Sequence, residues 1–184
     1  MRIECLERQD PADGKEILAT FLSSMLAVAR YGRTTIYEGD IYYIPYTMVT
    51  YLVEETKEQY RFLASEVSED ISVFREDGKN VIALSQKEVE EQYLVPGLKE
   101  ERQLLEEVER KIKLNKKMRK MFQRYQVTME KIETVYLPEQ TFYGRGKKDY
   151  LFLVDQLLQK VDFKNLDSVE RCFAQNYLNE RTRA

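Results

Sequence analysis

Apolar residues recur every three or four positions between residues 13 and 31, a spacing that predicts an amphipathic helix. The recurring positions are Ile17, Leu18, Phe21, Leu22, Met25, Leu26 and Ala29. Asp13 and Glu16 have the spacing of a capping box at the start of a helix. Gly32 suits the left-handed conformation that often ends one. The pattern therefore predicts one helix over 13–31.

A region rich in β-branched and aromatic side chains follows over 40–54 and predicts a strand. Two further segments, 59–67 and 70–74, predict two more strands. Asp77–Gly78 predicts a hairpin turn to the strand after them. Pro45 lacks the backbone N–H that a sheet ladder needs, so it predicts an edge, a bulge or a break.

The second half of the chain again shows helical patterns followed by strand patterns. Ser85 and Glu88 form another capping box and predict a short helix to about Leu94. An apolar stripe then predicts a long helix over 98–122. Three strands are expected in the region 131–163, and a C-terminal helix is expected to begin at Asp167.

The two halves also share a short sequence motif. Tyr43-Ile44-Pro45 and Tyr136-Leu137-Pro138 place an aromatic, an aliphatic and a proline in the same order, about 93 residues apart. Tyr60, Phe62 and Leu63 align in the same way with Tyr150, Phe152 and Leu153. We therefore predict an α+β protein made of two similar helix-plus-antiparallel-meander units, 1–84 and 85–184. This internal duplication, with its long central helix and C-terminal helix, resembles cystatin-like units in element order, which implies nothing about function.

Composition narrows the class of protein. A chain of 184 residues with 43% hydrophobic residues can bury a core, which argues against disorder. A net charge of -3 argues against a dominant polyanion-binding role, although local patches can still bind anions. We expect a cytoplasmic protein, because the sequence has no signal-peptide pattern and no transmembrane segment, and its two isolated cysteines suit reduced thiols.

Candidate chemistry is sparse. The chain contains no histidine, which removes the commonest general base and the commonest metal ligand. We find no nucleophile motif and no spacing typical of a metal site, so we expect no cofactor and no metal. An enzyme of unknown class, with a site between the two units, is the third of three functional interpretations.

The first interpretation rests on tyrosines. Tyr42, Tyr43, Tyr46 and Tyr51 crowd one β region, and a sheet with two faces cannot point all of them into one small core. Exposed tyrosines are good anchors for protein partners. We interpret the chain as a non-enzymatic protein-interaction module that binds a partner or a second copy of itself. Cross-strand aromatic packing is the alternative explanation of the same residues.

The second interpretation rests on residues 110–124, which carry eight basic residues and no acid. The candidate anion-binding residues are Lys113, Lys116, Lys117, Lys120 and Arg124. The favoured explanation is a solvated face at the C-terminus of the long helix, where cations offset the helix dipole. The alternative is a site for the phosphates of nucleic acid or of an anionic surface.

Overall fold

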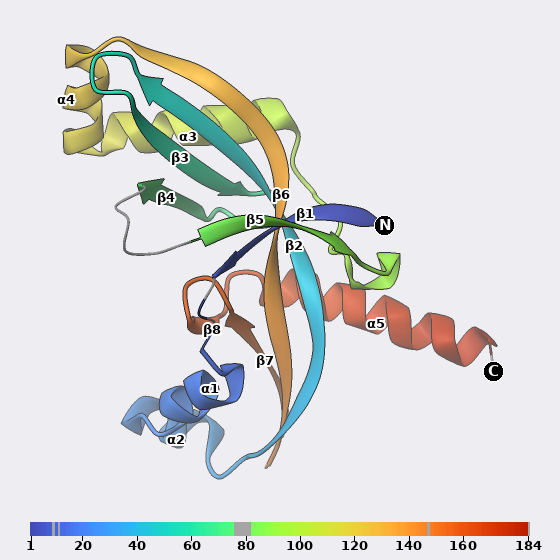
Figure 1. Cartoon of the computed structure of the whole chain (residues 1–184). Coiled ribbons are helices and arrows are strands. Elements are labelled where there is room, and N and C mark those ends of the chain that lie inside the picture. Colours follow the sequence, from blue (N-terminus) through green and yellow to red (C-terminus); the bar gives the residue numbers. More distant parts are fainter. Residues whose placement is uncertain (9, 11, 76–81, 147, 184) are drawn as a thin grey trace. The chain divides into compact units, whose positions relative to one another are not determined.

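The protein has an α+β fold in the computed structural model (Figure 1), which describes residues 1–8, 10, 12–75, 82–146 and 148–183. The described part contains five α-helices and a mixed, mostly antiparallel open sheet. The chain divides into two compact units, each built from segments that are discontinuous in sequence. Unit 1 comprises Met1–Ile44, Ile82–Val95 and Tyr136–Ala184, and unit 2 comprises Pro45–Val81 and Pro96–Val135.

Two 19-residue strands, β2 (Thr35–Val53) and β6 (Val127–Arg145), belong partly to each unit. They are divided between the units at Ile44/Pro45 and Val135/Tyr136, close to the two Tyr-x-Pro motifs. The predicted boundary between residues 84 and 85 separates the two copies of a repeat in the sequence. This division differs in kind from the compact units, which are interleaved along the chain, and it stays a prediction.

Unit 1 holds the shorter strands β1 (Arg2–Arg8), β5 (Ile82–Glu88), β7 (Asp149–Asp155) and β8 (Lys160–Asp162). β1 pairs antiparallel with β5 and meets β6 in parallel at the pair Cys5–Tyr136. β6, β7 and β8 form an antiparallel meander, in which Phe142 lies opposite Phe152.

Unit 2 contains the other antiparallel meander, formed by the second part of β2 with β3 (Glu58–Ser65) and β4 (Ile71–Arg75). Phe62 lies opposite Val49 on one side and opposite Val73 on the other. β6 begins beside the end of β2, where the Glu54 N–H donates to the Gln126 carbonyl at 3.0 Å.

The first predicted helix is two helices, α1 (Gly14–Leu22) and α2 (Met25–Tyr31). Ser24 interrupts them, because its hydroxyl accepts from the Ala27 N–H at 3.3 Å and so caps α2. The core beneath them comes mainly from β6, β7 and β8, and Ile36 at the start of β2 packs beside it. The unit 1 core contains Leu18, Ala27, Tyr31, Phe142, Phe152 and Val154.

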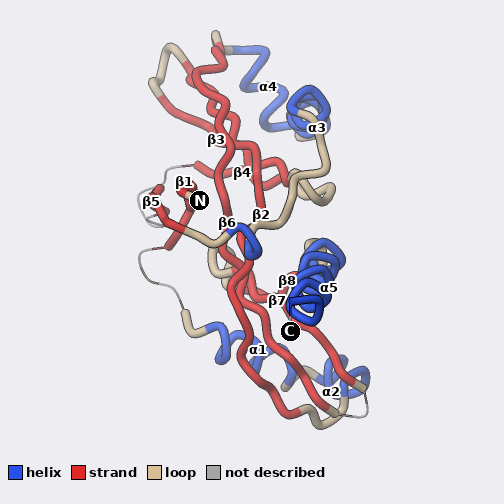
Figure 2. Tube along the Cα trace, turned by 90° about the vertical axis from the view of Figure 1, so that its right-hand side faces the viewer, coloured by secondary structure: helices blue, strands red, loops and turns tan. Residues whose placement is uncertain are grey.

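The long helix is likewise divided, into α3 (Glu101–Leu114) and α4 (Lys116–Arg124). These two helices pack on β2 and β3, as the trace in Figure 2 illustrates within unit 2. The buried core of unit 2 contains Val49, Phe62, Ala64, Leu104, Val108 and Ile112. Each helical pair therefore covers the meander that belongs to the other half of the sequence.

The order of elements repeats along the chain: two helices, a 19-residue strand and two shorter strands occur twice, over 14–75 and over 101–162. This order agrees with the repeat seen in the sequence. A common origin of the two halves stays a prediction.

The predicted helix over 85–94 is wrong. β5 continues to Glu88 in antiparallel pairing with β1, and only a short 3₁₀ turn follows at Glu91–Tyr93. The expected hairpin turn at Asp77–Gly78 lies outside the described residues. The C-terminal helix α5 (Leu166–Arg183) begins one residue before its predicted start, and it packs against β7 and the 3₁₀ turn.

Candidate anion-binding face of α4

Asn115 separates α3 from α4 through its backbone and its side chain. Its extended backbone, with φ of -80° and ψ of 108°, ends α3, while its N–H still donates to the Lys111 carbonyl. Its side-chain Oδ1 accepts from the N–H groups of Lys117 at 3.1 Å and Met118 at 3.2 Å. Asparagine is among the preferred N-cap residues, so a new helix begins at Lys116.

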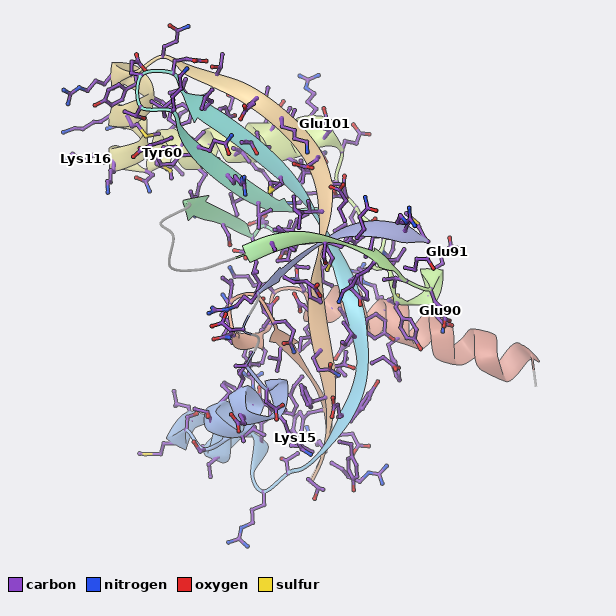
Figure 3. All side chains as sticks on the ribbon, in the orientation of Figure 1. Lys15, Tyr60, Glu90, Glu91, Glu101 and Lys116 are labelled. Carbon is purple, nitrogen blue, oxygen red and sulfur yellow. The ribbon has the colours of Figure 1, made fainter. Side chains whose placement is uncertain are left out.

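One face of α4 holds the helix on unit 2. Met118 and Phe122, four positions apart, pack against the core, and the Phe122 ring meets the Tyr51 ring edge-on at 5.3 Å. The remaining positions point outward because 3.6 residues complete each turn. Figure 3 shows Lys116 at the start of α4, extending away from the strands.

The outward side of α4 carries five exposed basic residues. These residues, here called the basic face, are Lys116, Lys117, Arg119, Lys120 and Arg124. None of them forms an ion pair with an acid in the part of the chain that the structure describes. Neighbouring bases of unit 2 differ, since Lys113 pairs with Glu109 at 3.1 Å and Lys131 with Glu133 at 2.6 Å.

The break at Asn115 changes what the helix dipole can explain. α3 has Glu101 in its first turn and Lys113 in its last turn, as the dipole favours. α4 has no acid in its first turn, where Lys116 and Lys117 lie. Cations are unfavourable there, so the dipole does not account for these two lysines. It accounts for Lys111 and Lys113 at the end of α3 and for Arg124 at the end of α4.

The predicted anion-binding set is thereby divided. Four of its five members, Lys116, Lys117, Lys120 and Arg124, lie on the basic face, whereas Lys113 pairs with Glu109 on α3. Sequence reasoning omitted Arg119 from the set and missed the cap. The signal for the cap was present, because an asparagine before a new helical turn is a recognised start signal.

The predicted partner-binding tyrosines are largely covered within the chain. Tyr42 is 1% exposed, and its ring meets that of Tyr93 edge-on at 5.8 Å. Tyr46 is also buried, and half-buried Tyr51 packs against Phe62 and Phe122. Tyr43 is half-buried, and this burial raises the pKa of its phenol. Aromatic packing accounts for these side chains, and a partner role for them stays a prediction.

A buried polar cluster in unit 1 was not foreseen. Asn165 donates through its amide to Glu139 at 2.7 Å and to Asp162 at 2.8 Å. Asp155 lies opposite Glu139 in the β6–β7 ladder and accepts from the N–H groups of Leu157 and Leu158. Glu139 lies in β6 between Pro138 and Gln140, and no local pattern marks an acid that will be buried.

Burial raises the pKa of Glu139 well above its usual range, and the nearby carboxylates of Asp162 and Asp155 raise it further. The Asn165 amide acts in the opposite direction, because its hydrogen bond favours the charged form. Glu139 is 1% exposed, so its carboxyl group is closed to any substrate that stays in solvent. The cluster therefore belongs to the structural core of unit 1.

Across the described residues, no group of three or more His, Cys, Asp or Glu side chains has a geometry suited to holding a metal ion. No helix in the described ranges is both long enough and apolar enough to cross a membrane. Comparisons with protein-family models, with curated proteins and with solved structures found no match.

Proposed function

We propose that the chain is a non-enzymatic binding module that contacts the phosphate groups of an anionic partner through the basic face of α4. The position of Lys116 and Lys117 carries this proposal. Two cations in the first turn of a helix, with no acid beside them, oppose the helix dipole. Natural proteins break such local stability rules at functional sites, which is why these two lysines support a binding role.

The spacing of the basic face suits a row of phosphates. Lys116, Lys120 and Arg124 lie four residues apart, which places their Cα atoms about 6 Å apart over about 12 Å of helix. Asn115 already satisfies the Lys117 and Met118 N–H groups, so the side chains supply the positive charge. Both nucleic acid and anionic lipid headgroups present phosphates, so binding to nucleic acid and binding to anionic vesicles have to be measured separately.

Binding of this kind is dominated by charge and should weaken steeply with salt. For duplex DNA, the logarithm of affinity falls with the logarithm of salt concentration by about 0.9 for each phosphate neutralised. The net charge of -3 for the whole chain opposes binding at long range. We therefore expect measurable affinity at low salt only.

The test uses the full chain against duplex DNA, single-stranded RNA and vesicles containing anionic phospholipid, each over a range of salt. The test variant combines Lys116→Gln, Lys117→Gln and Lys120→Gln. The matched control combines Arg102→Gln, Lys113→Gln and Lys131→Gln, which removes the same charge from unit 2 at positions that pair with glutamates.

We expect the test variant to lose binding to one of these partners and the control to retain most of it. With duplex DNA, the salt slope should fall by about three, one for each lysine removed. Equal loss in both variants would reduce the effect to net charge and overturn the assignment to α4. No binding to any of the three partners at low salt would overturn the proposed function itself.

The repeated element order supports a second proposal, that the chain arose by internal duplication of a helix-plus-meander unit with cystatin-like element order. On this proposal residues 13–75 superpose on residues 98–163, with Pro45 and Pro138 at equivalent places. A difference in strand order or handedness between the two segments would refute it. Binding of a protein partner or a second copy through the tyrosines, and a cytoplasmic location, also stay proposals.

A further inference from the structure

The outward face of α2 is apolar. Ala27 and Tyr31 are buried and hold the helix on the core of unit 1. On the opposite side, Met25 is 83% exposed and Leu26 is 86% exposed, with Val28 and Ala29 exposed beside them. A surface helix normally presents polar residues to water. An apolar face on a soluble domain is typical of an interaction surface.

The segment that carries this face is basic. Residues 17–37 contain no acid, and both bases among them, Arg30 and Arg33, are exposed. The turn between β6 and β7 lies next to Arg33, because a Cβ built on Gly146 would stand 3.1 Å from the Arg33 carbonyl oxygen. This turn adds the exposed side chains of Arg145 and Lys148, against the single acid Asp149.

Three classes of occupant fit this face poorly. A symmetric contact places the same patch of two copies against itself, so both copies would bring Arg30 and Arg33 to the contact and neither would bring an acid from residues 17–37. A helix that fills a protein groove uses anchors at i, i+3, i+4 and i+7, whereas position i+7 from Met25 is Gly32, outside the helix. A nucleic acid offers phosphates to the arginines but no apolar surface to Met25 and Leu26.

We infer that α2 inserts Met25 and Leu26 into the interface of an anionic lipid bilayer, with Arg30 and Arg33 at the headgroup phosphates. A bilayer supplies an apolar layer and negative charge together, and it demands no complementary shape. The face is short, so binding is reversible and depends on anionic lipid. This inference does not rest on α4, which lies in unit 2.

The absence of tryptophan allows a site-specific test in the full chain. A single Leu26→Trp substitution gives a fluorophore on the outward face of α2, where the larger side chain has space. A Leu98→Trp substitution places the same fluorophore at an exposed leucine of unit 2 as the control. The probes are vesicles of phosphatidylcholine with phosphatidylglycerol and vesicles of phosphatidylcholine alone.

The Leu26→Trp emission should shift to the blue with anionic vesicles and should be quenched by brominated lipid. It should change little with neutral vesicles, and the Leu98→Trp emission should not change. No shift at Leu26→Trp with anionic vesicles would overturn the inference. Shifts of equal size at both positions, or a shift that follows protein concentration without lipid, would also overturn it.

A second measurement separates this surface from α4. Met25→Ser with Leu26→Ser should reduce vesicle cosedimentation at least tenfold without loss of the folded circular dichroism spectrum. The Lys116→Gln, Lys117→Gln, Lys120→Gln variant should leave the fluorescence shift at Leu26→Trp in place. Loss of that shift in the α4 variant would assign membrane contact to α4 and overturn the role of α2.

Discussion

The Asn115 side chain accepts a hydrogen bond from the Lys117 N–H at 3.1 Å, at a point where the apolar pattern predicts the interior of one long helix. This break changes the expected effect of the helix dipole on Lys116 and Lys117. In one long helix they would lie near the C-terminus, where the dipole favours cations. In the structure they lie at the N-terminus of α4, where it does not.

Replacing Lys116 and Lys117 together by Gln should leave the protein as stable as before or make it more stable. Each cation removed from the first turn relieves an unfavourable interaction of about 0.3–1 kcal/mol at low salt. Thermal and urea unfolding at low and high salt measure the change, which should shrink as salt screens the charges. A lower melting temperature would show that the two lysines stabilise the fold and would weaken the functional explanation.

Asn115→Ala should reduce the free energy of unfolding by about 0.5–2 kcal/mol, because two N–H groups of α4 lose their acceptor. Asn115→Asp is the control, since an aspartate also caps α4, and its charge is favourable at the start of α4 but unfavourable at the end of α3. Urea denaturation should place the aspartate variant close to the original protein. An alanine variant of unchanged stability would contradict the assigned cap.

Glu139→Gln should change how stability depends on pH. The pKa of Glu139 is raised in the folded protein, above an ordinary value of 4.5. Its neutral form is therefore favoured by folding, and this contribution is complete below about pH 4.5 and is lost as pH rises towards the folded pKa. Glutamine cannot ionise and keeps an oxygen for the Asn165 amide, so the variant should be relatively more stable at pH 8.

Urea midpoints of both proteins between pH 4 and pH 8 test this sign. The advantage of Glu139→Gln should grow with pH and should be smallest at pH 4. A variant that becomes relatively less stable as the pH rises would mean that Glu139 is folded as a stabilised carboxylate, contrary to its burial beside Asp162.

Tyr42→Ala should reduce the free energy of unfolding by about 3–5 kcal/mol, as expected when a large buried aromatic is truncated. Tyr37→Ala, at an exposed tyrosine of the same strand, is the control and should have a much smaller effect. Light scattering over a range of concentration should give the same oligomeric state for both variants. A small loss of stability in Tyr42→Ala together with loss of self-association would instead support the tyrosines as an interaction surface.

The sequence by itself determined most of the local elements and the faces that they bury, although it predicted a helix where the end of β5 and a short 3₁₀ turn lie. The spacing of Leu18 and Leu22, and that of Val108 and Ile112, marks helices, and the alternation around Phe62 marks a strand, because these patterns follow from the geometry of neighbouring residues. It also located the concentration of positive charge that became the basic face. It missed the breaks at Ser24 and Asn115, because the apolar stripe continues across both, through Ala27 and through Met118.

Only the tertiary structure decided which helix covers which strands. α1 and α2 pack on Phe142 and Phe152, far along the chain, and α3 and α4 pack on Val49 and Phe62. Apolar periodicity records that a face is buried, without recording its partner. The partners depend on β2 and β6, because each of these strands runs through both units. Pairing between segments that are distant in sequence is a property of the folded chain.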